Sequence, residues 1–198
     1  KQWHTSKNGD LTPSDFFAKS GIKVWWKCDK GDDHEWESII VNRTRGRGCP
    51  MCANYITVKS NCLVTTHPQL AKQWHQTKNN TLYPENFTHG SHQKIWWKCD
   101  KGEDHEWITS IKSRANRGTN CPVCAGKKTV HSNSIATTHP ELVKEWHPTK
   151  NGTLTPSDVI KNSHKMIWWQ CPKYKDHVWE SVVSNRTRHK TICSVCDN

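Results

Sequence analysis

Three groups of cysteine and histidine residues recur along the chain with nearly constant spacing. Each group reads Cys-x5-His, then 14 or 15 intervening residues, then Cys-x2-Cys. A two-residue gap lets two thiolates of one tight turn reach the same ion, and three thiolates with one imidazole form a tetrahedral donor set that suits Zn2+. We therefore predict three zinc sites, formed by Cys28, His34, Cys49 and Cys52, by Cys99, His105, Cys121 and Cys124, and by Cys171, His177, Cys193 and Cys196.

Other uses of these residues are less consistent with the pattern. Disulfides would leave an odd cysteine in each group, and no secretory signal is visible. Packed histidines or iron–sulfur ligation are alternatives, but a histidine that recurs at a fixed spacing from cysteine favours zinc. Four protein ligands leave no open coordination position, so we predict structural zinc and no catalytic residues.

Several nearby residues fall outside the predicted ligand sets. Cys62 stands where the next repeat has Ser134, which predicts a free thiol. An aspartate precedes each ligand histidine. It either contacts that histidine or lies at a solvent-exposed loop tip. The histidines that follow a tryptophan are expected to be surface or packing residues; they are His4, His75 and His147.

The tryptophans define three repeats. Trp3, Trp74 and Trp146 are 71 and 72 residues apart, and all 12 Trp residues follow the same spacing, four to a repeat. We place the repeats at residues 1–57, 58–129 and 130–198. The first begins two residues before its Trp, whereas the others open with a similar longer segment. We therefore expect the chain to be a piece of a longer protein, with other domains of that protein as partners and with an N-terminally truncated first repeat.

The composition agrees with small metal-dependent domains. Only 33% of the 198 residues are hydrophobic, yet the chain contains 12 Trp and 10 Cys. Such units bury too little aliphatic surface to offset the entropy of chain ordering, while structural zinc contributes on the order of 10 kcal/mol. The longest apolar run is four residues, Met166–Trp169, which excludes a transmembrane helix. We expect no membrane partner. We expect an intracellular protein, in the cytoplasm or nucleoid, or in the nucleus or virion for a eukaryotic or viral source.

Short elements must position the ligands. The segments 67–74 and 139–146 have Pro at a helix start and a Leu/Trp pair four residues apart, which predicts a short helix. Turns are expected at residues 8–9, 79–80 and 151–152, and second helical starts at 12–15 and 155–158. The runs 23–28 and 35–41 predict strands, with the Cys-to-His knuckle between them. In the first strand Trp26 shares a face with Val24 and Cys28, while Trp25 points the other way. The fold class predicted is small α+β zinc-stabilised domains.

The combined pattern resembles a known family. Its motifs are Trp-Trp-Lys-Cys, His-Glu-Trp, the segment 42–52, and the preceding Leu-x-x-x-Trp-His and Thr-Lys-Asn. Together they are similar to the probable zinc-ribbon or treble-clef repeat found in tandem in bacterial, phage and large-virus proteins, sometimes beside very-short-patch-repair or restriction-type nucleases. The resemblance covers essentially all residues and implies tandem treble-clef-like zinc fingers with a zinc knuckle, a β-hairpin and a helix beginning near Cys-x2-Cys. The third repeat departs from it at Ser194 and in the knuckle 172–175.

Basic residues gather between each hairpin and the second cysteine pair. The net charge is +11, and acidic residues gather instead at the knuckle. This separation of positive from negative charge, in a stretch that contains Arg and Gly, is consistent with contact to phosphate groups. The simpler alternative is that these residues are solvent-exposed loop charges with no ligand. We expect binding of nucleic acid, first duplex DNA and second single-stranded DNA or RNA, with stacking on spare Trp faces an option for unpaired bases. The expected contacts are Arg43, Arg45, Arg47, Arg114, Arg117, Arg186, Arg188 and Lys190.

Two other functions remain open from the sequence. Exposed Trp and helix faces could form a protein–protein interaction array in which the positive charge only aids solubility. Alternatively, the repeats could be the targeting module of a nuclease whose catalytic domain lies outside this chain. Catalysis within these residues is not expected, because each knuckle histidine is already assigned to zinc and no acidic cluster recurs: Asp32 and Asp33 of the first repeat become Lys175 and Asp176 in the third.

Overall fold

The computed structural model describes residues 2–189, 193 and 196. The chain divides into two compact units, Lys1–Trp97 with Ile108–Thr119, and Lys98–Trp107 with Asn120–Asn198. This division passes through the second repeat. The boundaries 1–57, 58–129 and 130–198 stay a prediction from the sequence.

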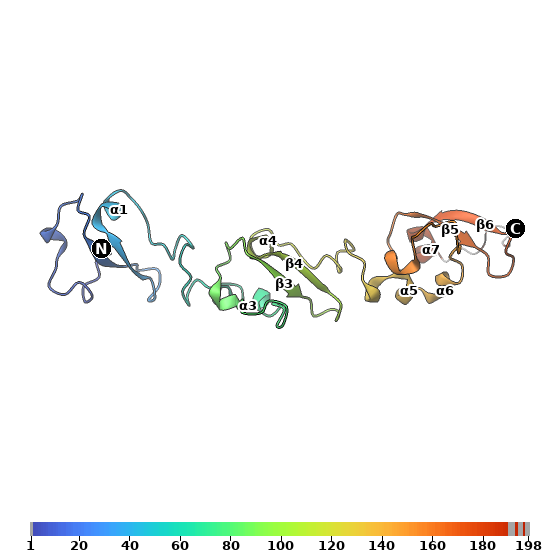
Figure 1. Ribbon diagram of the computed structural model, residues 1–198, viewed down its shortest axis with the longest axis horizontal. Helices are drawn as coiled ribbons and strands as arrows, with labels where there is room; N and C mark the ends of the chain where they lie inside the picture. Colours follow the sequence, from blue (N-terminus) through green and yellow to red (C-terminus); the bar gives the residue numbers. More distant parts are fainter. Residues whose placement is uncertain (1, 190–192, 194–195, 197–198) are drawn as a thin grey trace. The chain divides into compact units, whose positions relative to one another are not determined.

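Each repeat contains a β-hairpin followed by a short helix (Figure 1). The strands form three two-stranded sheets, β1-β2, β3-β4 and β5-β6. The predicted strand 35–41 is shorter than expected, because its last two residues belong to the helix. The bounds are β1 Lys23–Lys27, β2 Glu35–Ile39 and α1 Ile40–Thr44; β3 Lys94–Lys98, β4 Glu106–Ser110 and α4 Ile111–Ala115; β5 Met166–Gln170, β6 Val178–Val182 and α7 Val183–His189.

Register places the paired tryptophans on opposite faces of the hairpin. In β1 and β2 the pairing is antiparallel, with Trp26 opposite Trp36 and Trp25 opposite Glu37. In β5 and β6, Trp169 is likewise opposite Trp179. Alternation of side chains along a strand then directs one Trp of each pair to the core. The predicted separation of the two tryptophans is confirmed.

Short helices precede the second and third hairpins. The predicted helix 67–74 is confirmed in part: it ends at Ala71, because Trp74 leaves the helix to form a bridge with Trp97. The rings of these two residues meet edge to face at 5.8 Å. The helices are α2 Leu63–Thr66, α3 Pro68–Ala71, α5 Ile135–Thr138 and α6 Pro140–Val143, and the single 3-10 turns are η1 Pro13–Asp15, η2 Pro84–Asn86, η3 His131–Asn133 and η4 Pro156–Asp158.

The turns predicted after each helix hold the outer edge of the hairpin. Gly9, Asn80 and Gly152 adopt the left-handed conformation, with φ of 58°, 48° and 60°. The asparagine before each of them pairs with the backbone of a strand Trp. Asn8, for example, accepts from Trp25 N at 2.8 Å and donates to Trp25 O at 2.9 Å. The asparagine side chain thus takes the place of a neighbouring strand.

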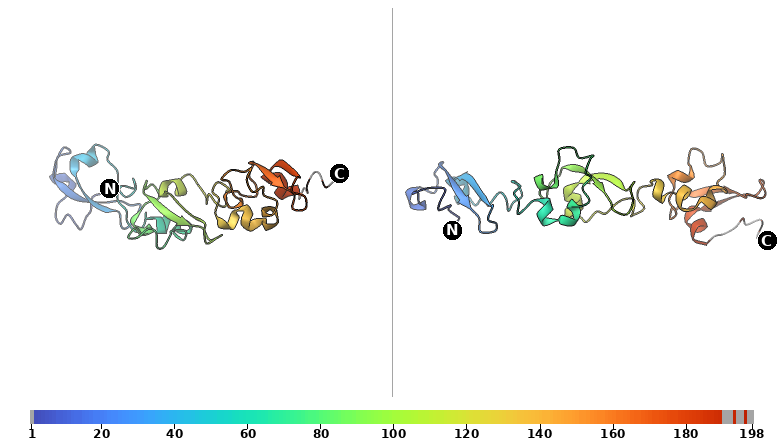
Figure 2. Two further views of the ribbon diagram at one scale, coloured as in Figure 1. Left: turned by 45° about the vertical axis from the view of Figure 1, so that its right-hand side comes forward. Right: turned by 90° about the horizontal axis from the view of Figure 1, so that it is seen from below.

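A small core surrounds the inward Trp of each hairpin. In the third repeat, Trp169 is 0% exposed, and it packs with Ile135 of α5, Leu142 of α6, Ile167 of β5 and Val183 of α7. Figures 1 and 2 show α5 and α6 in gold beside the hairpin of β5 and β6. The indole N–H of the buried Trp donates to a strand carbonyl, as buried Trp side chains require; for Trp169 the acceptor is Ser181 O at 3.1 Å.

Candidate metal centres and basic loops

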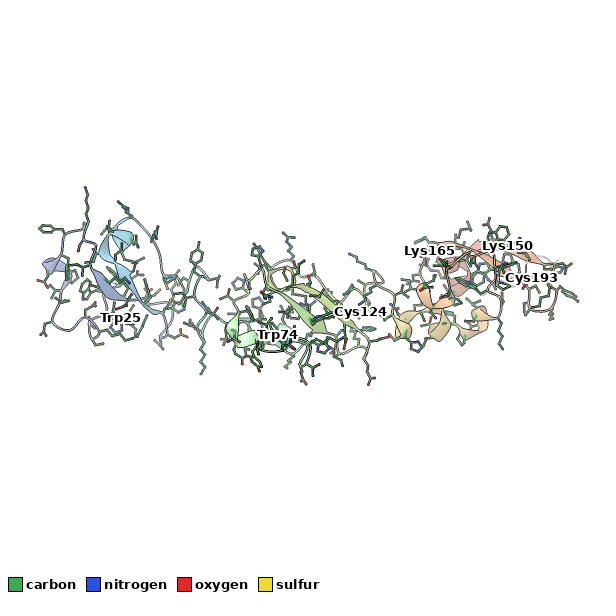
Figure 3. All side chains as sticks on the ribbon, viewed as in Figure 1. Trp25, Trp74, Cys124, Lys150, Lys165 and Cys193 are labelled. Atoms are coloured by element: carbon green, nitrogen blue, oxygen red, sulfur yellow. The ribbon has the colours of Figure 1, made fainter. Side chains whose placement is uncertain are left out.

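The structure brings the twelve predicted metal residues together in three clusters. In each cluster the candidate ligand atoms, three Sγ and one histidine nitrogen, lie within 4.8 Å of one another. Cys124 of the second cluster and Cys193 of the third are labelled in Figure 3. The clusters are Cys28, His34, Cys49 and Cys52; Cys99, His105, Cys121 and Cys124; and Cys171, His177, Cys193 and Cys196.

The distances within each cluster match the edges of a zinc tetrahedron. Bonds of about 2.3 Å to sulfur and 2.0 Å to nitrogen give S···S edges of about 3.8 Å and S···N edges of about 3.5 Å. Cys28 Sγ and Cys52 Sγ are 3.7 Å apart, and Cys52 Sγ lies 3.4 Å from His34 Nδ1. In the second cluster the corresponding S···S and S···N distances are 3.7 and 3.4 Å. In the third cluster they are 3.8 and 3.4 Å. Three Cys3His clusters therefore fit three zinc sites, and all ten cysteines are free of disulfides.

The last cysteine of each cluster is held against ionisation in the absence of a cation. Desolvation and neighbouring thiols raise the pKa of Cys52 to about 11, and the same causes act on Cys124 and Cys196. Thiolates are the zinc-binding form, so metal binding must displace their protons. With four protein ligands the coordination is closed, which suits a structural ion.

A tight knuckle places the histidine beside the first cysteine. Cys28 N donates to His34 O at 2.9 Å, and His34 N donates to Gly31 O at 3.1 Å. A Cβ at Gly31 would lie 2.8 Å from His34 Cδ2, and one at Gly102 would lie 2.6 Å from His105 Cδ2. These glycines leave room for the imidazole ring, and the sequence interpretation missed them. Their recurrence three residues before the histidine in two repeats was the available signal.

The third knuckle reaches the same ligand geometry with a different residue. Tyr174 occupies the position of Gly31 and accepts the bond from His177 N at 3.2 Å. Its ring lies 5.0 Å from the His177 ring. The departure of this repeat from the family pattern therefore leaves its ligand set intact.

The Cys-x2-Cys pair sits in a single helical turn. Tyr55 N donates to Pro50 O at 2.8 Å and Asn54 N to Met51 O at 3.0 Å, with Asn54 left-handed at φ 61°. This is the Schellman pattern that ends a helix. Gly126 ends the equivalent turn of the second repeat in the same way, with φ 66°. The helix implied by the family resemblance is therefore one turn long in these two repeats, which corrects that expectation.

The far nitrogen of the ligand histidine contacts the start of the next repeat. His34 Nε2 lies 3.0 Å from Ser60 Oγ, which donates to Asp33 Oδ1 at 2.6 Å. Ser132 makes the same contacts in the second site, 3.3 Å from His105 Nε2 and 2.7 Å from Asp104 Oδ1. Of the two interpretations of the aspartates, the structure favours contact with the histidine, through a serine that the sequence interpretation did not assign.

Three of the predicted phosphate contacts pack against the inward Trp of their hairpin. Arg114 is 5% exposed and Arg186 is 3% exposed, while Arg43 is half-buried. Each guanidinium lies over the inward Trp, with 5.1 Å from Arg114 Cζ to the Trp97 centroid and 5.3 Å from Arg186 Cζ to the Trp169 centroid. Each also donates to a residue 41 positions earlier; the acceptors are Gln2, Gln73 and Glu145. We therefore withdraw these three arginines from the nucleic-acid contacts, because they hold the tryptophan core together.

The other basic residues lie on the surface. Arg45 and Arg47 are exposed on either side of Gly46, which ends α1 with φ 85°. Arg117 and Arg188 are exposed at the ends of α4 and α7. Lys190 lies outside the described residues. The backbone N–H groups of Gly46 and Arg47 donate to Arg43 O and Asn42 O, so these two groups are already paired within the chain.

A lysine covers the outward Trp of each hairpin. Lys150 Nζ lies 4.2 Å from the Trp168 centroid, and Lys7 lies over Trp25 at the same distance (Figure 3 labels Lys150 and Trp25). Lys78 lies 4.8 Å from the Trp96 centroid. A base could stack on these rings only by displacing the lysine.

Two minor predictions are confirmed. Cys62 is a free, buried thiol whose Sγ lies 3.3 Å from Lys59 O. In the next repeat Ser134 makes the equivalent contact, with its Oγ 2.9 Å from His131 O. The histidines after the helical Trp are packing residues: His75, for example, is buried and its Nδ1 accepts from Lys78 N at 3.2 Å.

Comparison with known proteins agrees with this geometry. The probable treble clef zinc finger domain family matches the chain three times, over residues 1–55, 70–127 and 142–198. No curated protein matches the chain. Among the described residues, no helix has the length and apolar character needed to cross a bilayer.

Proposed function

The chain belongs to the family of probable treble clef zinc finger domains, and we propose that it is a nucleic-acid-binding module. Duplex DNA is the proposed ligand, with single-stranded DNA or RNA second. The zinc ions in this proposal are structural, and the module itself carries out no catalysis. Zinc-bound thiolates suit a reducing compartment, so we place the protein inside the cell.

The observation that carries the proposal is the position of the exposed arginines. Arg45 and Arg47 follow α1, Arg117 follows α4, and Arg188 lies near the end of α7, so each hairpin unit presents exposed arginine around the end of its short helix. The chain has 29 Lys and Arg against 18 Asp and Glu, so the surface as a whole attracts an anion. A guanidinium donates two parallel hydrogen bonds to a phosphate, which makes these loops suited to a nucleic-acid backbone.

Duplex DNA is favoured over unpaired strands because the outward tryptophans are covered. Single-strand binders present free aromatic faces for stacking. Here Lys7 and Lys150 already occupy the faces of Trp25 and Trp168. Three linked units that each contact phosphates gain affinity from their linkage.

The exposed apolar side chains favour a second candidate, a protein-interaction array. Phe17 is 88% exposed and Tyr55 is 86% exposed. Side chains of this kind are enriched in protein interfaces. An array of this type would bind a protein partner and would show no nucleic-acid binding even at low salt.

The test is a salt series on protein whose zinc content has been counted. Replacing Arg45, Arg47, Arg117 and Arg188 together by Ala should lower the salt slope for duplex DNA by about 0.9 for each phosphate that is no longer neutralised, or about 3 to 4 in all. A charge-matched control replaces the exposed knuckle residues Lys30, Lys101, Lys173 and Lys175 by Ala. An equal decrease in slope in both variants, or none in the arginine variant, would overturn the proposed surface.

A further inference from the structure

The residues that open the second repeat hold both halves of the first zinc site. Ser60 contacts the knuckle: its Oγ lies 3.0 Å from His34 Nε2, and its backbone N donates to Asp33 Oδ2 at 2.8 Å. Asn61 contacts the Cys-x2-Cys turn, since its Nδ2 donates to Met51 O at 2.9 Å. Met51 lies between the ligands Cys49 and Cys52. We call this dipeptide the Ser-Asn clasp.

The second zinc site has the same clasp. Ser132 Oγ lies 3.3 Å from His105 Nε2 and donates to Asp104 Oδ1 at 2.7 Å. Asn133 Nδ2 donates to Val123 O at 3.4 Å, between the two cysteine ligands of that site. The recurrence in a second repeat indicates a built feature and not an accidental contact.

Immediately after each clasp the chain enters the core of the next repeat. Leu63 is 0% exposed, and its N donates to Phe87 O at 2.8 Å. Ile135 is equally buried in the third repeat, and its N donates to Val159 O at 2.7 Å. Only a few residues therefore separate the outer contacts of one zinc site from the interior of the following repeat.

We propose that Ser60 and Ser132 are positioning residues for zinc, and that through them metal binding in one repeat stabilises the fold of the next. A histidine that binds zinc through Nδ1 carries its proton on Nε2, which donates to the serine Oγ. The serine hydroxyl in turn donates to the aspartate carboxylate. Such outer contacts fix the tautomer and orientation of the ligand. Because coupling free energies are reciprocal, the fold of the next repeat also strengthens the metal site.

The first test uses the full chain loaded with an NMR-active cadmium isotope, so that each site gives its own resonance. Ser60→Ala removes the hydroxyl but keeps the backbone N–H bond to Asp33. It should shift the resonance of the first site and speed metal loss to a chelator there by about tenfold, the lower end for outer contacts. Ser132→Ala should do the same at the second site only, and Ser60→Thr should restore the first.

The controls are within the same chain. The resonance of the third site should keep its position and rate in both variants, and Ser14→Ala, at an exposed serine of η1, should change none of the three. Unchanged shifts and rates at all three sites would overturn the positioning role.

The second test measures the coupling to the next repeat by hydrogen exchange. Cys49→Ser, which empties the first site, should speed exchange of the Leu63 amide and leave the Ile135 amide protected. Cys121→Ser, which empties the second site, should speed exchange of the Ile135 amide in the third repeat. Unchanged protection of Leu63 in the first variant and of Ile135 in the second would overturn the coupling. Neither test measures nucleic-acid binding, so failure of the proposed function would leave both outcomes unchanged.

Discussion

Replacing Arg114 by Met should destabilise the second repeat, whereas replacing Arg117 by Met should not. Arg114 Nη1 donates to Thr119 O at 2.5 Å, Nη2 donates to Gln73 Oε1, and the guanidinium lies over Trp97. Removing the cation–π interaction costs about 1 to 2 kcal/mol. Thr119 O and Gln73 Oε1 are part-buried, so the loss of its donor costs each of them about 1 to 1.5 kcal/mol, the lower part of the range for an unsatisfied carbonyl. The sum is about 3 to 5 kcal/mol in the free energy of unfolding.

Hydrogen exchange of the amides in α4 is the assay. The bonds from Lys112 N to Ser91 O and from Asn116 N to Lys112 O should open more readily in the variant. A decrease of about 3 kcal/mol raises the opening equilibrium more than a hundredfold, since about 1.4 kcal/mol corresponds to a factor of ten.

The exposed neighbour is the matched control. Arg117→Met removes the same charge three residues further along the chain, at an exposed position after α4, so its effect on the free energy of unfolding should stay within about 0.5 kcal/mol. The salt slope of DNA binding should fall for Arg117→Met. Unchanged α4 exchange in Arg114→Met, with a lowered salt slope, would refute the assignment of Arg114 to the interior.

Three further outcomes follow from the geometry. Glu145→Gln should change stability little near neutral pH, because Gln73 fills that place in the second repeat and a buried ion pair gains little over a neutral one. Burial raises the pKa of Glu145 despite the neighbouring Arg186. In urea unfolding, the stability of the wild type relative to the variant should therefore fall as pH rises through that pKa. Gly31→Ala should weaken metal retention at the first site, since its Cβ would meet His34, whereas Gly48→Ala, with open space around it, should not; equal retention in a chelator assay would contradict this. Cys62→Ser should cost less than about 1 kcal/mol and leave the zinc content unchanged, because Ser134 makes the same contacts in the next repeat; a large drop in the thermal unfolding temperature would contradict it.

The zinc ligands could be found from the sequence because their spacing is short-range and recurs. A Cys-x5-His knuckle and a Cys-x2-Cys turn each fix two ligands locally, so only one long-range contact per repeat had to be inferred. The strands and the opposite faces of Trp25 and Trp26 followed from alternation alone. Helix lengths did not follow, because a bridge to the hairpin removes Trp74 from its helix and Asn54 ends the turn after the ligands.

The role of the arginines could not be read from charge. Arg43, Arg114 and Arg186 lie in the same basic segments as the exposed residues, and only the tertiary fold shows that Trp rings and a partner 41 residues away surround them. Their constant position, seven residues after the last Trp of each repeat, was the available signal. The exposed arginines do not keep one spacing. A constant spacing between repeats indicates packing, while a variable spacing is typical of surface charge.

The zinc content of the folded chain tests the central claim most directly. Metal analysis of protein purified under reducing conditions should give three zinc ions per chain, and the ratio should fall to two in each of Cys49→Ser, Cys121→Ser and Cys193→Ser. Thiol titration after unfolding and chelation should find all ten cysteines reduced. A folded chain without zinc, or one whose cysteines are oxidised in pairs, would contradict the account.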